Sequence, residues 1–167
     1  MKRAVWLIGL CAVACGKNGE FRPLQVGDAA PTYSATTMRG DTIALRALQG
    51  RPVLLNVWAT WCIPCRTEMP GIQQLQAAFA DSGLEVIAVS VDEAGSDVDV
   101  QMFVDTYGIR FTVLRDPDKR VSRAFRTLGV PETFLVDRQG KIARRWIGEF
   151  DPASEAVKTA VRQALRG

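Results

Sequence analysis

The sequence predicts a single α/β domain in which helices pack around a mixed β-sheet. Continuous apolar runs, as expected of strands covered on both faces, alternate with stretches whose apolar residues recur every three or four positions. A hairpin and an amphipathic helix follow at the end of the chain. The 167 residues, of which 47% are hydrophobic and 23% charged, are enough to build one ordinary core.

The first half of this domain is expected to hold a hairpin, a buried strand and a long helix. Residues 33–45 alternate around a central Arg-Gly-Asp turn, which predicts the hairpin. The run "RPVLLNVWA" at 51–59 is apolar throughout and begins with a proline, as expected of a strand buried on both faces. Helical periodicity then extends from Cys62 to about Ser82, and Gly83 ends it.

The second half is expected to continue the alternation and close the sheet. In chain order, we predict a buried strand at 84–92, a helix at 97–108, a short strand at 111–116, a helix at 119–129, a hairpin at 133–148 and a last helix from about 152 to 165. Because strands alternate with helices before a closing hairpin, the sheet should contain both parallel and antiparallel pairs.

The first fifteen residues are typical of a secretion signal. Lys2 and Arg3 precede an apolar run of about eleven residues, which is too short to span a bilayer as a helix because that takes ~20. The run ends in "AVAC" before a glycine, which resembles a bacterial lipoprotein box with Cys15 as the lipidated residue. A plain cleaved signal and an uncleaved anchor are the alternatives. We therefore expect a signal at 1–15, a tether at 16–26 and the domain at 27–167.

Composition excludes several functions. The chain has no histidine, which rules out an imidazole base and any metal or haem site with a histidine ligand. Without Lys2 and Arg3 of the signal, 19 basic residues stand against 18 acidic ones. This near balance gives no reason to expect nucleic acid as a partner.

The pair Cys62 and Cys65 is the chemical centre of the sequence. Cys62 follows a buried strand and opens a helix, so unpaired backbone N–H groups and the helix dipole favour its thiolate. Cys65 lies almost one turn further on and should be more covered. It can attack a mixed disulfide formed at Cys62 and release the client. The intervening Ile63 and Pro64 stiffen the turn and offer little to hold a metal.

Two other uses of the pair are open. A structural disulfide across so short a loop would stabilise the fold little, because it constrains the unfolded chain little. Half of a metal site would need two more ligands, and beyond the pair the mature chain offers only Cys15. We therefore expect neither a metal nor a cofactor.

Several motifs together resemble the thioredoxin superfamily. These are "WCIPC" after an apolar strand, Pro70 five residues past the second cysteine, and "GVPETFLVD" some 65 residues later. The stretch from "VGDAAPTYS" to "WCIPCRTEMP" is similar to the membrane-tethered bacterial branch of TlpA, ResA and CcmG (DsbE) proteins. The resemblance covers roughly residues 24–165 and implies a thioredoxin-like sandwich with an extra N-terminal hairpin.

The resemblance also implies roles for particular residues. Cys62 and Cys65 would form the redox disulfide, and Val130–Pro131 would form a cis-proline loop facing it. Val130 could then offer its backbone to an extended client segment, whereas proline has no N–H to offer. The residues expected to contact a client are Trp61, Ile63, Pro64, Val130, Pro131 and Glu132. Trp58 is expected in the core and Trp61 partly exposed beside Cys62.

The strand before the cysteines departs from cytoplasmic thioredoxin, which has a buried aspartate where this chain has Asn56. The tethered branch instead uses a glutamate three residues past the second cysteine, here Glu68. Because residues three apart are neighbours on a helix, Glu68 can lie beside Cys65. A partly buried carboxylate with a raised pKa could then accept the Cys65 proton. A solvated helix charge is the alternative for Glu68.

The expected function is that of an extracytoplasmic thiol-disulfide oxidoreductase held to the membrane by a lipid on Cys15. The branch implies reduction of client disulfides, with apocytochrome c as one possible client and an inner-membrane electron donor of the DsbD or CcdA type. A thiol peroxidase is the alternative, although that chemistry needs Thr or Ser at position 59, which is alanine. A copper-delivery module would need a distant histidine, which is missing.

Overall fold

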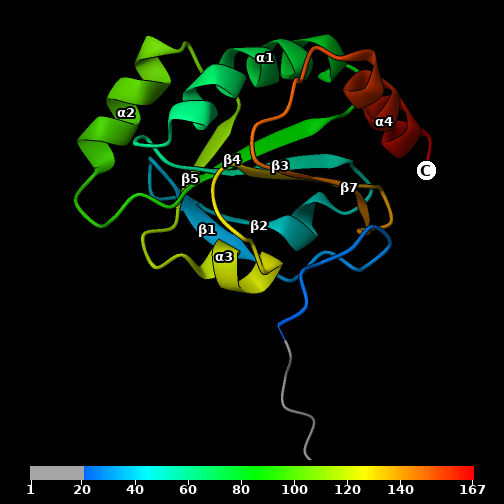
Figure 1. Ribbon diagram of the computed structural model, residues 1–167, viewed down its shortest axis with the longest axis horizontal. Helices are drawn as coiled ribbons and strands as arrows, with labels where there is room; N and C mark the ends of the chain where they lie inside the picture. The colour runs from blue at the N-terminus through cyan, green and yellow to red at the C-terminus, as the bar shows by residue number, and fades with distance from the viewer. Residues whose placement is uncertain (1–20) are drawn as a thin grey trace, which may run out of the picture.

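A computed structural model describes residues 21–167 and contains one seven-stranded sheet (Figure 1). The strand order is β2-β1-β5-β4-β3-β6-β7. The strands are β1 (Ser34–Thr37), β2 (Thr42–Ala44), β3 (Val53–Trp58), β4 (Glu85–Ser90), β5 (Thr112–Arg115), β6 (Glu132–Val136) and β7 (Ile142–Ile147). The helices are η1 (Leu45–Leu48, a 3-10 helix), α1 (Ile63–Phe79), α2 (Asp97–Thr106), α3 (Arg120–Phe125) and α4 (Glu155–Arg166).

The sheet is parallel at its centre and antiparallel at both sides. Strands β3, β4 and β5 run parallel, while β6 and β1 join them antiparallel and carry β7 and β2 at the edges. All six residues of β3 are buried, as its continuous apolar run predicts. The predicted mixed sheet with an N-terminal hairpin is therefore confirmed.

Helices cover both faces of the sheet. Figure 1 shows α1, α2 and α4 on one face, with α3 and η1 on the other. The two parallel crossovers, β3-α1-β4 and β4-α2-β5, continue in the same direction across the sheet, which puts both of their helices on one face. Helix α2 consequently lies on the same side as the helix that carries the cysteines.

Helix α3 is shorter than the segment predicted at 119–129. Its flanking residues Lys119 and Arg126 both have left-handed backbone angles, with φ of 55° and 51°. The Asp116 carboxylate accepts the backbone N–H of Val121 at 2.6 Å and so fixes the start of the helix. After Arg126 the chain forms the loop that leads to Pro131.

The described chain contacts the domain earlier than the expected boundary at residue 27. Leu24 is buried, and its carbonyl accepts a hydrogen bond from Arg145 Nη1 at 3.0 Å. Arg126 Nη1 donates to the carbonyl of Arg22 at 2.9 Å. Residues 22–26 are therefore not a free tether, because an apolar side chain and two carbonyls find partners on the domain. The expected signal segment, Cys15 and residues 16–20 lie outside the described residues.

Candidate active site

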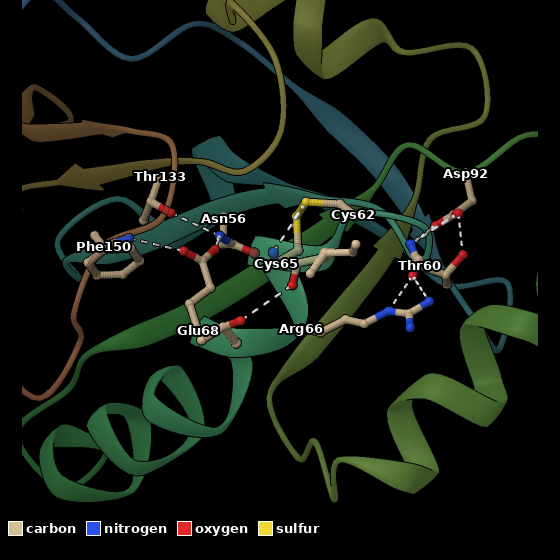
Figure 2. Close-up of a disulfide and its surroundings, with 11 residues drawn as sticks. Asn56, Thr60, Cys62, Cys65, Arg66, Glu68, Asp92, Thr133 and Phe150 are labelled. Atoms are coloured by element: carbon tan, nitrogen blue, oxygen red, sulfur yellow. Dashed lines mark hydrogen bonds between the residues drawn. A yellow bond between two sulfur atoms is a disulfide. The ribbon is translucent and has the colours of Figure 1, made fainter.

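The two cysteines lie where β3 gives way to α1, and they form a disulfide (Figure 2). Cys62 is the N-cap residue of α1, and its sulfur accepts the backbone N–H of Cys65 at 3.2 Å. Pro64 lies in the first turn of the helix, where a missing N–H breaks no helical hydrogen bond. Cys62 retains 4% of its surface exposed and Cys65 none. Cys62 is thus the sulfur that a client can reach.

Glu68 is buried one turn of α1 beyond Cys65. Its Oε1 accepts the side-chain amide of Asn56 at 2.7 Å, and its Oε2 accepts the backbone N–H of Phe150 at 3.4 Å. Burial raises the pKa of Glu68 to about 7, although both hydrogen bonds oppose the rise, and the nearby Glu149 adds to it. A carboxyl group with this pKa can accept or release a proton at neutral pH.

Asn56 connects the helix to the strand that follows the cis-proline. Its amide nitrogen donates to Thr133 Oγ1 of β6 at 2.9 Å as well as to Glu68, and Figure 2 shows the Asn56 amide next to both side chains. Asn56 is paired with Thr133 in the β3–β6 register, which brings the two together. An asparagine here supplies an uncharged donor, so it holds the Glu68 carboxylate without neutralising it.

A second polar network holds the turn that precedes Cys62. The buried Asp92, just beyond β4, accepts the backbone N–H of Thr60 at 3.0 Å, the Thr60 hydroxyl at 2.7 Å and the Ser90 hydroxyl at 2.8 Å. Arg66 of α1 donates to the Thr60 carbonyl through two nitrogens, at 2.9 and 2.7 Å (Figure 2). Thr60 is therefore attached both to the sheet and to the helix.

Sequence reasoning missed this network. One signal was available, because Asp92 closes the strand next to the one that leads to Cys62. The carboxyl ends of neighbouring parallel strands meet at one edge of a sheet, so a polar residue there is a candidate neighbour of the cysteine turn.

The loop before β6 contains the cis peptide bond Val130–Pro131, the isomer that the resemblance implied. The Pro131 carbonyl accepts the backbone N–H of Gly148 at 2.9 Å. Within residues 21–167, neither the N–H nor the carbonyl of Val130 takes part in a hydrogen bond. Among the residues that the structure describes, the backbone donor and acceptor of Val130 are thus both without a partner.

Glu132 does not lie on a client surface, and this expectation is corrected. Its side chain is fully buried, and Oε1 forms an ion pair with Arg145 Nε of β7 at 2.6 Å. Its Oε2 accepts the backbone N–H of Leu128 at 2.8 Å. A buried carboxylate needs such partners, and it supports the loop that leads to Pro131 from inside the domain.

Of the other residues expected to contact a client, four have side chains that reach the surface, whereas Pro131 is buried. Trp61 is 63% exposed, Ile63 is exposed as well, and Pro64 and Val130 are half-buried. Trp58 is wholly buried, as predicted, and packs against Phe103 of α2 with ring centres 4.5 Å apart and ring planes tilted by 42°. The apolar side chains of Trp61, Ile63 and Pro64, next to the cysteines in the chain, are therefore exposed or partly exposed to solvent.

Residues 21–167 hold neither a candidate metal centre nor a helix suited to span a membrane. No group of three or more Cys, Asp or Glu side chains there could hold a metal ion. No helix in that range has both the length and the apolar character to cross a membrane.

The thioredoxin-like sandwich and the disulfide at the start of α1 define a thiol-disulfide oxidoreductase. Residues 26–145 match the family model described as AhpC/TSA, and the chain belongs to that family.

Relatives and solved structures agree with this class. The chain is 37% identical over 134 residues to the thiol-disulfide oxidoreductase ResA of Bacillus thuringiensis (strain Al Hakam), covering 80% of this chain and 76% of the relative. It is 39% identical over 126 residues to the thioredoxin-like protein YneN of Bacillus subtilis (strain 168), covering 75% and 73%. A structure from Chlorobium tepidum, proposed to be the thiol:disulfide interchange protein DsbE, superposes with a TM-score of 0.78 at 33% identity, covering 85% of this chain and 99% of that one.

Proposed function

We propose that this oxidoreductase reduces disulfides of client proteins outside the cytoplasm, with Cys62 as nucleophile, Cys65 as resolving thiol and Glu68 as proton acceptor. One observation carries the proposal. Cys62 and Cys65 form a disulfide at the start of α1, and the buried Glu68, whose pKa burial raises to about 7, follows Cys65 by one helical turn.

The first step is attack of the Cys62 thiolate on one sulfur of the client disulfide. Two features support thiolate formation, the Cys65 N–H 3.2 Å from the Cys62 sulfur and the N-cap position at the positive end of the α1 dipole. The attack forms a mixed disulfide between Cys62 and the client, and the other client sulfur leaves as a thiolate.

The second step forms the disulfide between Cys62 and Cys65 and releases the client. The Cys65 thiol gives its proton to the Glu68 carboxylate, and the resulting thiolate attacks the Cys62 sulfur. The mixed disulfide breaks, the client leaves with both sulfurs reduced, and the enzyme holds the Cys62–Cys65 disulfide. Two electrons have then passed from the enzyme to the client.

The client is expected to bind as an extended strand over the sulfurs. The unpaired backbone N–H and carbonyl of Val130 supply a short edge for strand pairing, beside Pro131. Trp61, Ile63 and Pro64 supply apolar contacts on the cysteine side.

We propose that the enzyme acts on the outer side of the inner membrane, held there by a lipid on Cys15. A membrane-spanning donor of the DsbD or CcdA type would return it to the dithiol state. Apocytochrome c awaiting haem attachment is one client of suitable chemistry. The signal-like sequence at 1–15 and the similarity to ResA proteins support this location. The mass of the mature N-terminal peptide tests the lipid.

A thiol peroxidase is the other candidate, since the name of the AhpC/TSA family refers to such enzymes. The turn before Cys62 argues against it, because position 59 is a buried alanine and the nearest hydroxyl, that of Thr60, donates to Asp92. Peroxide consumption by the reduced protein is the direct test, and we expect none above the uncatalysed rate.

The proposal is tested by insulin reduction with dithiothreitol as electron source. We expect Cys62→Ser to abolish catalysis, whereas Cys65→Ala should accumulate a mixed disulfide at Cys62. Undiminished turnover by Cys62→Ser would remove the proposed nucleophile.

A further inference from the structure

We infer that the cleft between Trp61 and helix α2 binds one large apolar side chain of the client, close in sequence to the client cysteine. This inference rests on the proposed function and adds a substrate preference to it. The cleft has a volume of about 500 Å³ and is lined by Thr60, Trp61, Arg66, Asp99, Met102, Phe103, Thr106 and Tyr107.

Four of the residues that line the cleft carry large apolar or aromatic side chains, namely Trp61, Met102, Phe103 and Tyr107. Trp61 is 63% exposed and Met102 of α2 is 55% exposed, although each carries a large apolar side chain. Phe103 is buried and stacks on Tyr107 with ring centres 4.4 Å apart, so aromatic rings form part of the lining. An apolar side chain bound in the cleft would cover part of the exposed surface of Trp61 and Met102, which favours binding.

The charges at the cleft do not favour a charged ligand. Arg66 and Asp99 both line it, one cation and one anion. Arg66 is already engaged through Nε and Nη2 with the Thr60 carbonyl. Because the opposite charges offset each other, neither an acidic nor a basic side chain gains much by entering, and apolar burial decides the preference.

The topology puts the cleft in line with the client strand. Strand β3, which leads to Cys62, has β6 on one side and β4 on the other. Val130, whose backbone would pair with the client, directly precedes β6, whereas α2 follows β4. Figure 2 shows Thr133 of β6 on one side of the disulfide and Thr60 of the cleft on the other. A client segment paired with Val130 and bonded through sulfur to Cys62 therefore continues toward the cleft. Adjacent residues of an extended chain advance ~3.3 Å each, so the side chain that enters is within a few positions of the client cysteine.

The test uses synthetic peptides with one cysteine joined to thionitrobenzoate, a coloured thiol. The Cys62 thiolate attacks the peptide sulfur and expels the coloured thiol, and Cys65 then releases the reduced peptide. Peptides differ only in carrying Phe or Ala at one of the three positions before the cysteine or the three after it. With the protein reduced beforehand and observed over a single turnover, we expect the second-order rate constant for release of the coloured thiol to favour Phe on one side by on the order of tenfold, a size typical of apolar pockets.

Two substitutions in α2 test whether the preference for Phe arises from the cleft. Met102→Glu puts a charge into the cleft wall and should bring the Phe-to-Ala ratio to within about twofold of unity. Val98→Glu is the matched control, since Val98 is 69% exposed on the same helix but does not line the cleft, and it should keep the wild-type ratio. Both variants should reduce a small disulfide without peptide at the wild-type rate, because neither residue belongs to the sulfur site.

The outcomes are distinct. Turnover of peptides with no Phe preference, or a preference that survives in Met102→Glu, overturns the cleft while leaving the proposed function intact. If Val98→Glu loses the Phe preference as fully as Met102→Glu does, the cleft is also overturned, because any negative charge on α2 would then explain the loss. Failure of the wild-type protein to reduce any disulfide would refute the proposed function and this inference with it.

Discussion

The side-chain amide of Asn56 donates to the carboxylate of Glu68 at 2.7 Å, inside the domain and next to the helix turn that carries Cys65. Burial raises the pKa of Glu68 to about 7, and two uncharged donors, the Asn56 amide and the Phe150 backbone N–H, oppose this rise without cancelling it. Cation pairing at this place would hold the carboxylate ionised. The arrangement therefore gives a proton acceptor that is half-charged near neutral pH.

Replacing Glu68 by glutamine should slow the resolving step. Glutamine preserves the shape but cannot take the proton of Cys65, so resolution of a mixed disulfide at pH 7 should slow by about 10²-fold. Stopped-flow measurement of client thiol release gives this rate directly. Alkylation of Cys62 in the reduced protein should stay within about twofold of wild type, since Cys62 has its own donors. An unchanged resolving rate would remove Glu68 from the mechanism.

Glu68 should also make stability depend on pH. Its folded pKa of about 7 exceeds the ordinary value of 4.5, so the folded protein binds more protons between these pH values than the unfolded chain does. The free energy of unfolding should therefore fall as pH rises from 4.5 to 7, by up to about 3 kcal/mol, and level off above. Urea titrations of the oxidised protein measure this slope, and Glu68→Gln should flatten it. A slope that survives the substitution would contradict the assignment.

Arg145 should matter far more for stability than its neighbour Arg144. Arg145→Met leaves the Glu132 carboxylate buried without its cation, at a cost of about 3–5 kcal/mol of unfolding free energy. Arg144→Met, on the exposed side of the same strand, should cost no more than about 0.5 kcal/mol. Adding Glu132→Gln to Arg145→Met should restore much of the loss. Equal effects of the two arginines would disagree with a buried pair.

Removing the Asp92 carboxylate should loosen the turn before Cys62. Asp92→Ala deprives the Thr60 N–H and two hydroxyl groups of their acceptor, and an unsatisfied buried donor costs about 1–3 kcal/mol. We expect a loss of this order or more by chemical denaturation, together with faster hydrogen exchange at Thr60. The exposed Glu93→Ala is the control and should change neither quantity. Protection of Thr60 that is equal in both variants would count against the network.

Much of the fold could be predicted because its signals are local. The continuous apolar run of β3 and the helical periodicity after Cys62 each lie within one element, and the structure confirms both. The place of Glu68 could be anticipated for the same reason, because three residues along a helix fix a neighbour.

Contacts between distant segments could not be predicted in this way. Thr60 and Asp92 are 32 residues apart and meet only because β3 and β4 are parallel neighbours. Glu132 was expected at the client surface from the family resemblance alone. Its partner Arg145 lies on the next strand, and only the β6–β7 pairing brings the two charges together. The cleft beside Trp61 likewise exists only because α2 crosses on the same face as α1.

The most direct test of a Cys62 thiolate is to measure alkylation of the reduced protein by iodoacetamide as a function of pH. Mass spectrometry then locates each labelled cysteine. The N-cap position of Cys62 predicts fast labelling of that residue at pH 6, where an ordinary thiol with a pKa of ~8.5 is almost unreactive, and little labelling of Cys65. Equal and slow labelling of both cysteines at that pH would contradict a thiolate at Cys62, and with it the proposed order of the two sulfurs.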